Sequence, residues 1–248
     1  MRFTTIFGLL LGFIIILTIL FLSGSKEYFI NITALLITVG GTLCATIIYY
    51  SPKALHITLI VLKKLFFSKQ LYSNQFTEII VNLARKSRKI GFVSLLKTNE
   101  ARQDAFLYNA LTLLADGYSA GEIREVLATK SVSDSDNFMI AERVLRTAGS
   151  LAPIFGMLGT VTGLIIMLGR ITNPETIPSA MGIALVSTFY GLILSGLILK
   201  PLSGKIRDKN GFEVSNHTII TEGIILIRKG ENSQIIRERL SSYNVSSL

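Results

Sequence analysis

Hydroxyl side chains stand in two long apolar runs of the sequence, and their oxygens are groups that could bind an ion. Thr160 lies in a run without Asp, Glu, Lys or Arg at 147–169, and Ser187 and Thr188 lie in a second such run at 176–199. Hydroxyl oxygens can ligate a hard cation such as sodium. Neither run contains a carboxylate, the group on which ion pathways in membranes usually depend. If these hydroxyls line an ion path, a partner must supply the acid.

Small residues accompany these hydroxyls at helical spacing. Gly159 and Gly163 are four apart, and Ser187, Gly191 and Ser195 share one helical face. This spacing lets two helix backbones approach closely, or it places hydroxyls along a polar path, and the sequence leaves both interpretations open. The candidate residues for lining such a path are Thr160, Ser187, Thr188 and Gly191.

The sequence does not indicate an enzyme or a bound cofactor. It has no serine–histidine or HExxH pattern, and the glycine-rich string at 156–163 (GMLGTVTG) lacks the lysine of a phosphate-binding loop. Cys44 is the single cysteine, so an internal disulfide or a cysteine metal cluster is impossible. The two histidines, His56 and His217, are far apart in sequence. We therefore expect neither catalysis nor a resident metal.

The charge-free runs predict the elements that position these groups. There are four, at 3–25, 28–52, 147–169 and 176–199, and about 20 apolar residues suffice for a helix to cross a bilayer. Half of the residues are hydrophobic and 17% are charged, a composition that excludes a disordered chain and is unusual for a soluble domain. We predict an all-α, four-span transmembrane helical membrane protein, with spans at 3–23, 30–50, 147–169 and 177–200. A cleaved signal peptide is the alternative for the first run.

The basic residues predict the orientation of these spans. Of 25 Lys and Arg residues, 14 lie between residues 51 and 146 and 8 lie from residue 200 onward. Cytoplasmic loops are rich in Lys and Arg, so both segments and both termini are expected in the cytoplasm of a multi-pass inner-membrane protein. The predicted parts are a transmembrane hairpin at 1–50, a cytoplasmic helical domain at 51–146, a channel-lining hairpin at 147–200 and a cytoplasmic helical tail at 201–248. This distribution accounts for the net charge of +9 without nucleic acid.

Apolar periodicity divides the cytoplasmic segments into helices. Leu55, Leu59, Leu62 and Phe66 predict a helix along the membrane surface. Phe76, Ile79, Ile80 and Leu83 predict a second helix, and residues 105–116 a third that Gly117 ends. Ser119 and Glu122 form a capping box that opens a fourth, and the pattern after Asp136 continues toward the third span. In the tail, a helix is expected to resume near Glu213, to end at Gly230 and to restart at Asn232 or Ser233.

Two prolines stand at the predicted ends of the spans. Pro153 lies where the third span enters the membrane, and Pro201 where the fourth leaves it. Each removes a backbone donor and can bend its helix, or it simply marks a helix end.

Several strings resemble the flagellar stator A-subunits, MotA and PomA, of the MotA/TolQ/ExbB superfamily. They are found at 152–164 (APIFGMLGTVTGL), 173–175 (NPE), 180–191 (AMGIALVSTFYG), 201–205 (PLSGK), 88–92 (RKIGF) and 222–232 (EGIILIRKGEN). The likeness covers nearly the whole chain. The TolQ and ExbB members have three spans and lack an N-terminal hairpin of this kind, so the likeness is to the stator branch.

The resemblance implies a part of a rotary motor for bacterial motility and chemotaxis. Five A-subunits surround two copies of a single-span, peptidoglycan-binding B-subunit, whose aspartate carries the ion, sodium or proton. Ion flow is expected to turn this homopentamer against the rotor switch protein of the flagellum. By position, Thr160, Ser187, Thr188 and Gly191 match the ion path, Pro153 and Pro201 the coupling prolines, and Arg88 and Lys89 the residues that face the rotor.

The chain departs from the family pattern at one place, which keeps other functions open. The family has an acidic residue shortly after the Arg-Lys pair, whereas here the first acid is Glu100. An energiser that acts on a non-flagellar envelope partner is therefore a first alternative, and a membrane scaffold without ion traffic is a second. The hydroxyls slightly favour sodium over protons.

Overall fold

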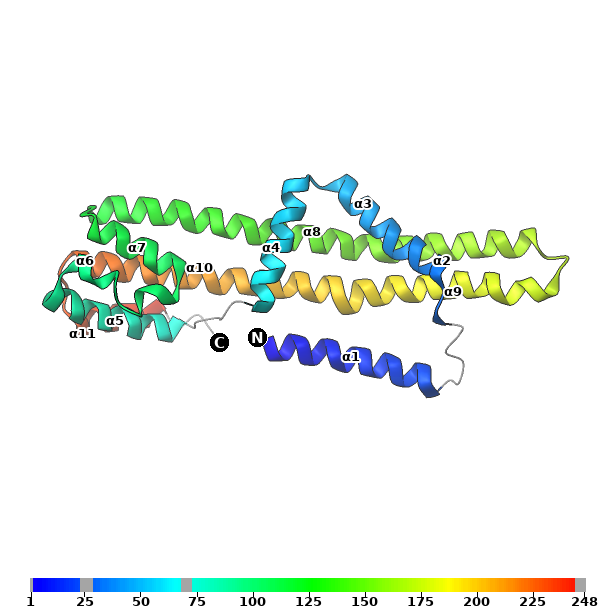
Figure 1. Cartoon of the computed structure of the whole chain (residues 1–248), viewed down its shortest axis with the longest axis horizontal. Coiled ribbons are helices and arrows are strands. Elements are labelled where there is room, and N and C mark those ends of the chain that lie inside the picture. The colour runs from blue at the N-terminus through cyan, green and yellow to red at the C-terminus, as the bar shows by residue number, and fades with distance from the viewer. Residues whose placement is uncertain (1, 23–28, 68–72, 244–248) are drawn as a thin grey trace. The chain divides into compact units, whose positions relative to one another are not determined.

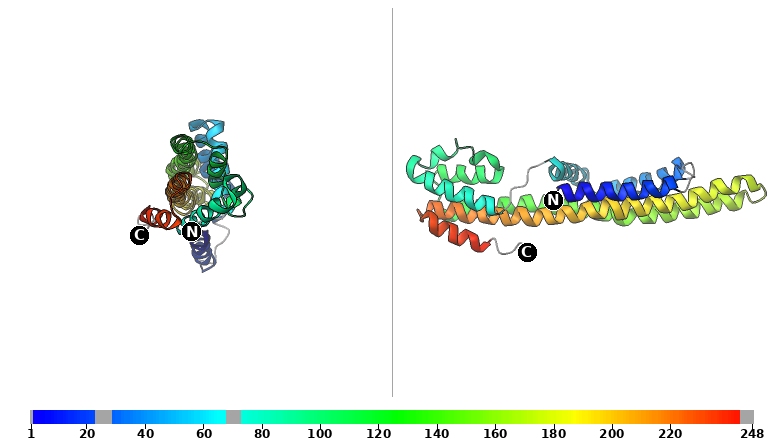
Figure 2. Two further views of the ribbon diagram at one scale, coloured as in Figure 1. Left: turned by 90° about the vertical axis from the view of Figure 1, so that its left-hand side faces the viewer. Right: turned by 90° about the horizontal axis from the view of Figure 1, so that it is seen from below.

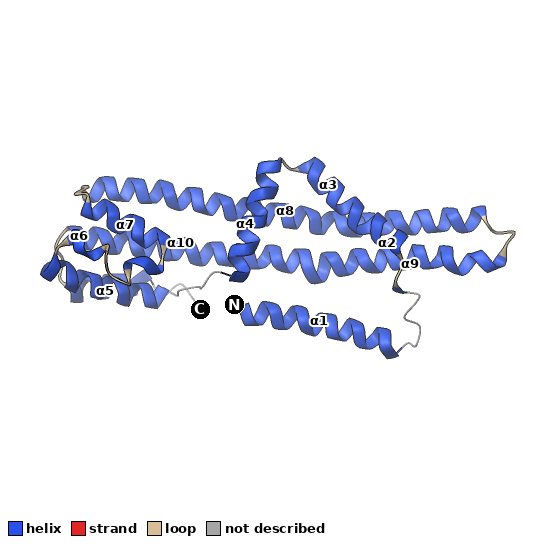
Figure 3. Ribbon diagram, viewed as in Figure 1, coloured by secondary structure: helices blue, strands red, loops and turns tan. Residues whose placement is uncertain are grey.

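The computed structural model describes residues 2–22, 29–67 and 73–243. These residues form helices joined by short turns, and no strand occurs among them (Figures 1 and 3). Contacts divide the chain into two units, one of Met1–Phe67 with Phe138–Arg207 and one of Ser68–Asn137 with Asp208–Leu248. The predicted all-helical class is confirmed. The predicted turn between the first two spans, at 24–27, lies outside the described residues.

Three helices are long and apolar enough to cross a membrane: Ile32–Tyr49, Ala120–Gly169 and Ile177–Arg228. The first consists of α2 (Ile32–Leu35), a π-helical segment η2 (Leu36–Gly40) and α3 (Gly41–Tyr49), and the second is α8. The third consists of α9 (Ile177–Ile193), a π-helical segment η5 (Leu194–Leu199) and α10 (Lys200–Arg228). The predicted first span coincides with α1 (Arg2–Leu22), an apolar helix of 21 residues.

Two of these helices extend further than the sequence pattern indicated. The 50 residues of α8 form one helix of about 75 Å, which contains both the helix predicted to open at Ser119 and the predicted third span. The expectation that a tail helix resumes near Glu213 was wrong, because α10 continues directly from the predicted fourth span. Its polar first half contacts α8, since Ser203 Oγ donates to Glu142 O over 3.2 Å and Ile206 packs in a cluster with Ala141.

The short-range predictions for helix ends are confirmed. The third cytoplasmic helix, α7 (Ala105–Ala115), is followed by Gly117 at φ 88°, and α10 is followed by Gly230 at φ 75°. A positive φ of this size suits glycine, which has no side chain to clash. The capping box is formed in both directions, since Ser119 N donates to Glu122 Oε2 over 2.8 Å and Glu122 N donates to Ser119 Oγ over 3.3 Å.

The second unit packs around one apolar core. It contains α5 (Ser73–Ile90), α6 (Phe92–Leu95), the 3-10 turn η3 (Ala101–Gln103), α7, parts of α8 and α10, and α11 (Ser233–Ser241), which Asn232 caps. The predicted stripe on α5 is buried in this core. The buried residues of the core include Phe76, Ile80, Leu83, Leu107, Leu111, Leu114, Ile123, Leu127, Ile220 and Ile224.

Arginines fasten the helices of this unit to one another. The Arg237 guanidinium binds the Glu78 carboxylate through two hydrogen bonds of 2.5 and 2.9 Å, joining α11 to α5. Arg124 of α8 pairs with Glu222 of α10, and this partner raises the pKa of Arg124. Arg228 donates to the carbonyls that follow α7. The unit is therefore held by both its core and its surface pairs.

In the first unit, α4 (Pro52–Phe67) packs across α8 and α10. The cluster comprises Val61, Phe138, Ala141, Leu145, Leu202 and Ile206. Of the residues whose spacing predicted this helix, Leu62 and Phe66 pack against the cluster. Thr58 and Val61 are buried, whereas Leu59 is 60% exposed. Apolar side chains therefore occur on both the buried and the exposed sides of this helix.

Candidate functional site

The hairpin of α8 and α9 carries the candidate ion-path residues, and its two helices run side by side (Figures 1 and 2). Glycines allow the close approach. A Cβ added at Gly163 would lie 2.6 Å from Ala184 N and 2.8 Å from Ala180 O, and one at Gly191 would lie 2.7 Å from Ala152 O. These neighbours are backbone atoms that cannot move aside. The small-residue spacing therefore serves helix packing.

Within this contact, Thr160 and Thr188 meet. Their hydroxyls share a hydrogen bond, and they lie 28 residues apart in sequence. Thr160 Oγ1 is also 3.1 Å from Ala184 O, and Thr188 Oγ1 is 3.2 Å from Gly156 O. Each hydroxyl donates one proton and has two lone pairs, so the two threonine oxygens keep lone pairs that could face a cation. Both threonines are only partly buried.

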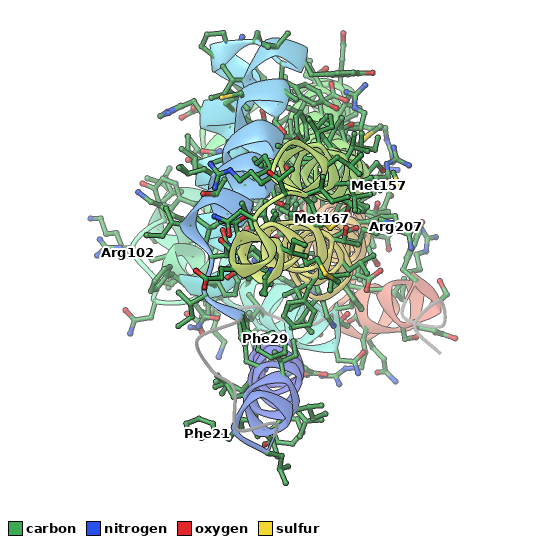
Figure 4. The ribbon with its side chains drawn as sticks, turned by 90° about the vertical axis from the view of Figure 1, so that its right-hand side faces the viewer. Phe21, Phe29, Arg102, Met157, Met167 and Arg207 are labelled. Atoms are coloured by element: carbon green, nitrogen blue, oxygen red, sulfur yellow. The ribbon has the colours of Figure 1, made fainter. Side chains whose placement is uncertain are left out.

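Ser187 and Gly191 occupy a different environment from this pair. Ser187 has no exposed surface in the subunit, and its hydroxyl donates to Ala184 O over 3.0 Å. Gly191 is buried against α8. Within a single chain these two positions lie in the helix contact beside Thr160 and Thr188. Their role in an ion path stays a prediction. Met157 of α8, labelled in Figure 4, is by contrast 55% exposed.

A third helix joins this contact through hydroxyls that the sequence analysis missed. Thr38, Thr42 and Thr46 are buried, four residues apart along Ile32–Tyr49. Thr42 and Thr46 each donate to the carbonyl four residues before, whereas Thr38 Oγ1 donates to Ser187 O over 3.1 Å. The signal was available, since three threonines at a spacing of four share one helix face.

The prolines do not mark helix ends. Pro153 lies inside α8, and Pro201 lies in the first turn of α10, which follows η5 without a break. In an unbroken helix residue 153 would donate to the carbonyl of Gly149, but proline has no N–H. Ser195 Oγ donates to that carbonyl instead, over 2.5 Å. The interpretation of either proline as a helix terminus was wrong.

The two predicted rotor-facing residues differ in their contacts. Arg88 Nη2 donates to Gly230 O over 2.9 Å and to Glu231 O over 3.0 Å, so it binds the carbonyls at the end of α10. A cation is favourable there because the carboxyl end of a helix carries partial negative charge. Arg88 and Lys89 are both exposed, but no hydrogen bond or ion pair of the Lys89 side chain occurs among the described residues. Arg88 therefore has a structural contact that Lys89 does not share.

The first acid after this pair is already engaged. Glu100 Oε1 accepts a hydrogen bond of 2.6 Å from Lys86 Nζ. This hydrogen bond, with a further one from the backbone, lowers the pKa of Glu100. Among the described residues, no three His, Cys, Asp or Glu side chains gather where they could hold a metal ion.

Comparisons with known proteins agree with this arrangement. Residues 98–218 match the MotA/TolQ/ExbB proton channel family. The chain is 30% identical to the chemotaxis protein PomA of Vibrio alginolyticus, over 98% of this chain and 95% of the relative. It is 32% identical to motility protein A of Aquifex aeolicus, over 94% of this chain and 93% of the relative.

A solved structure has the same fold. The match is to the flagellar MotAB stator complex from Bacillus subtilis, with a TM-score of 0.85, 28% identity, and 96% of this chain and 94% of that chain covered. Sequence and fold thus agree over nearly the full length. The chain belongs to the stator A-subunit (MotA/PomA) branch of the MotA/TolQ/ExbB proton channel family.

Proposed function

We propose that this protein is an ion-channel-forming stator subunit of the bacterial flagellar motor, which couples cation flow across the inner membrane to torque on the rotor. The observation that carries this proposal is the contact of Thr160 with Thr188 between two apolar helices. It forms a neutral, oxygen-rich group in segments without any carboxylate. Such a wall can pass a cation only when another polypeptide provides the charge.

The proposed partner is a single-span B-subunit that brings an ion-carrying aspartate and binds peptidoglycan. A solved relative is a MotAB complex, which supports this partner. Large apolar side chains on α8, including Ile154, Met157, Val161 and Ile165, are more than half exposed in the single chain. We propose that further copies of this subunit, five in all, and the B-subunit cover them. No cofactor is required beyond the transported cation.

The proposed topology has four spans with both termini in the cytoplasm. Three helices suit a membrane by length and composition, and α1 provides the fourth. The segments 51–146 and 201–248, which carry 21 of the 25 basic residues, are then cytoplasmic. In this arrangement Pro153 and Pro201 lie near the cytoplasmic ends of the channel-lining hairpin, where they would transmit ion-linked movement.

We propose that the rotor switch protein is contacted through the surface around Lys89. Arg88 supports this surface by holding the end of α10. The acid expected from the family pattern is absent between Lys89 and Glu100, and Glu100 is paired with Lys86. The contact therefore depends on basic residues.

A strain without other stators tests the proposal. With this subunit and its partner supplied, cells should swim, and swimming speed should follow the sodium concentration if sodium is the ion. A protonophore should stop them if the ion is the proton. Cells that stay non-motile at high sodium concentration and without a protonophore would contradict a flagellar role.

The lack of an acid between Lys89 and Glu100 also supports a second candidate, an energiser that drives a non-flagellar envelope partner. The neighbouring gene distinguishes the two. A single-span neighbour with a peptidoglycan-binding domain favours the stator, and one without that domain favours the energiser.

A further inference from the structure

The helix α4 begins where an apolar helix ends. Ile32–Tyr49 is followed by two residues, and α4 starts at Pro52. The hydroxyl of Tyr50 lies 2.8 Å from Thr147 Oγ1 and donates to Arg143 O over 3.1 Å. Thr147 is the first residue of the charge-free run in α8. The junction therefore lies level with the end of the predicted span, where a tyrosine is favoured.

From this junction α4 runs across the long helices and not along them (Figure 1). Its buried face contacts Phe138 and Leu145 of α8 and Leu202 and Ile206 of α10. All four residues lie outside the predicted spans 147–169 and 177–200, at two residues beyond a span for Leu145 and Leu202 and nine for Phe138. The 16 residues of α4 extend about 24 Å along this boundary.

The opposite face of α4 combines basic and apolar side chains. Among the described residues of the first unit, none covers the large apolar side chains of this face. The helix α4 contains no Asp or Glu. The exposed members of this face include Lys53, His56, Leu59, Ile60, Lys63 and Phe67, and the exposed Lys64 beside them lies over the Phe138 ring. Leu59 and Ile60 are more than half exposed, and Phe67 is 83% exposed. At 100° per residue these positions share one side of the helix.

We propose that this face binds the headgroups of anionic phospholipids at the cytoplasmic surface of the membrane. The proposal rests on the membrane topology of the proposed function. Lys53 and Lys63 would bind lipid phosphates, while Leu59, Ile60 and Phe67 insert among the acyl chains. A second copy of α4 fits this face less well, because its lysines would meet like charges with no acid to pair them.

A tryptophan introduced on this face is a specific fluorescent probe, because the natural chain contains no tryptophan. The purified full-length Ile60→Trp protein is placed in phosphatidylcholine vesicles that contain small fractions of brominated lipid, which quenches tryptophan on contact. We expect brominated phosphatidylglycerol to quench more strongly than brominated phosphatidylcholine at the same fraction. The expected preference is roughly fivefold for each lysine that contacts the lipid phosphates, and high salt should reduce it.

Three variants provide the controls. Lys53→Gln with Lys63→Gln should remove the preference, and Lys229→Gln, an exposed lysine of the second unit, should retain it. Ile48→Trp, on the 86%-exposed side chain of α3, should be quenched equally by both lipids.

The outcomes separate the possible failures. Equal quenching by both lipids at position 60 overturns the headgroup preference. Quenching at position 48 without quenching at position 60 means that protein covers α4, which also overturns the proposal. An absence of quenching at both positions contradicts the membrane topology itself, and with it the proposed function.

Discussion

Ser195 donates a hydrogen bond of 2.5 Å to the carbonyl of Gly149, the acceptor that Pro153 leaves without a helical donor. The two residues are 46 positions apart and belong to different helices. The bond joins η5 to α8 four residues before the proline. The neighbouring helix therefore supplies the donor that the proline removes from α8.

Replacing Ser195 with Ala should destabilise the hairpin by about 1–3 kcal/mol, because the buried Gly149 carbonyl loses its donor. Thermal unfolding of the full chain in detergent measures this. Pro153→Ala restores an N–H for the same carbonyl, so Ser195→Ala should cost less in that background. Strictly additive effects of the two changes would contradict the proposed relationship.

Replacing Thr188 with Val should abolish swimming while the protein still accumulates in the membrane. The variant keeps the shape of the side chain and removes one of the two hydroxyls that meet between α8 and α9. Thr188→Ser, which keeps the hydroxyl, is the matched control and should swim. Normal motility of the valine variant would show that the pair is needed for packing only.

Replacing Gly163 with Ala should push α8 and α9 apart, since the new Cβ would meet backbone atoms of α9. We expect this to destabilise the hairpin by about 1–3 kcal/mol. At Gly182, a Cβ meets nothing within 4 Å. Gly182→Ala is therefore expected to be neutral or slightly stabilising. Equal thermal stability of the two variants would argue against a close α8–α9 contact.

Arg88 and Lys89 should differ when each is changed to Ala. Arg88→Ala removes the donor to the end of α10 and should lower both motility and stability, the latter by about 1 kcal/mol. Lys89→Ala should lower motility and leave the unfolding temperature unchanged. A stable Arg88→Ala protein would show that the contact with α10 contributes little.

The Lys86–Glu100 pair should make the stability of the folded protein depend on pH in the acidic range. Lys86 lowers the pKa of Glu100 from its usual value of 4.5. A lowered pKa stabilises the folded state above pH 4.5, and this contribution is lost as the pH falls through the lowered value. Both side chains are partly exposed, so Lys86→Met should cost less than about 1 kcal/mol at pH 7.

Unfolding of wild-type and Lys86→Met protein across this pH range measures the effect. The difference between them should shrink as the pH falls below 4.5. Arg85→Met, at an exposed position on the same helix, should show no such dependence. A constant difference at all pH values would exclude the ion pair as its cause.

The sequence by itself determined the apolar helices and several ends of the cytoplasmic helices. The apolar helices follow from charge-free runs of sufficient length. Gly117 and the Ser119–Glu122 box end and begin helices as predicted, because their hydrogen bonds join residues within one or two turns. The family likeness came from the same source, in strings such as 180–191 and 201–205.

Only the tertiary structure decided which residues meet. The Thr160–Thr188 contact, the bond from Thr38 to Ser187 and the bond from Ser195 to Gly149 join residues 28 to 149 positions apart. Such pairs depend on the register and rotation of whole helices, which the chain fixes by packing small residues against backbone. Only the structure, too, showed that α10 continues from the fourth predicted span through the polar residues before Glu213, where the sequence pattern predicted an interruption.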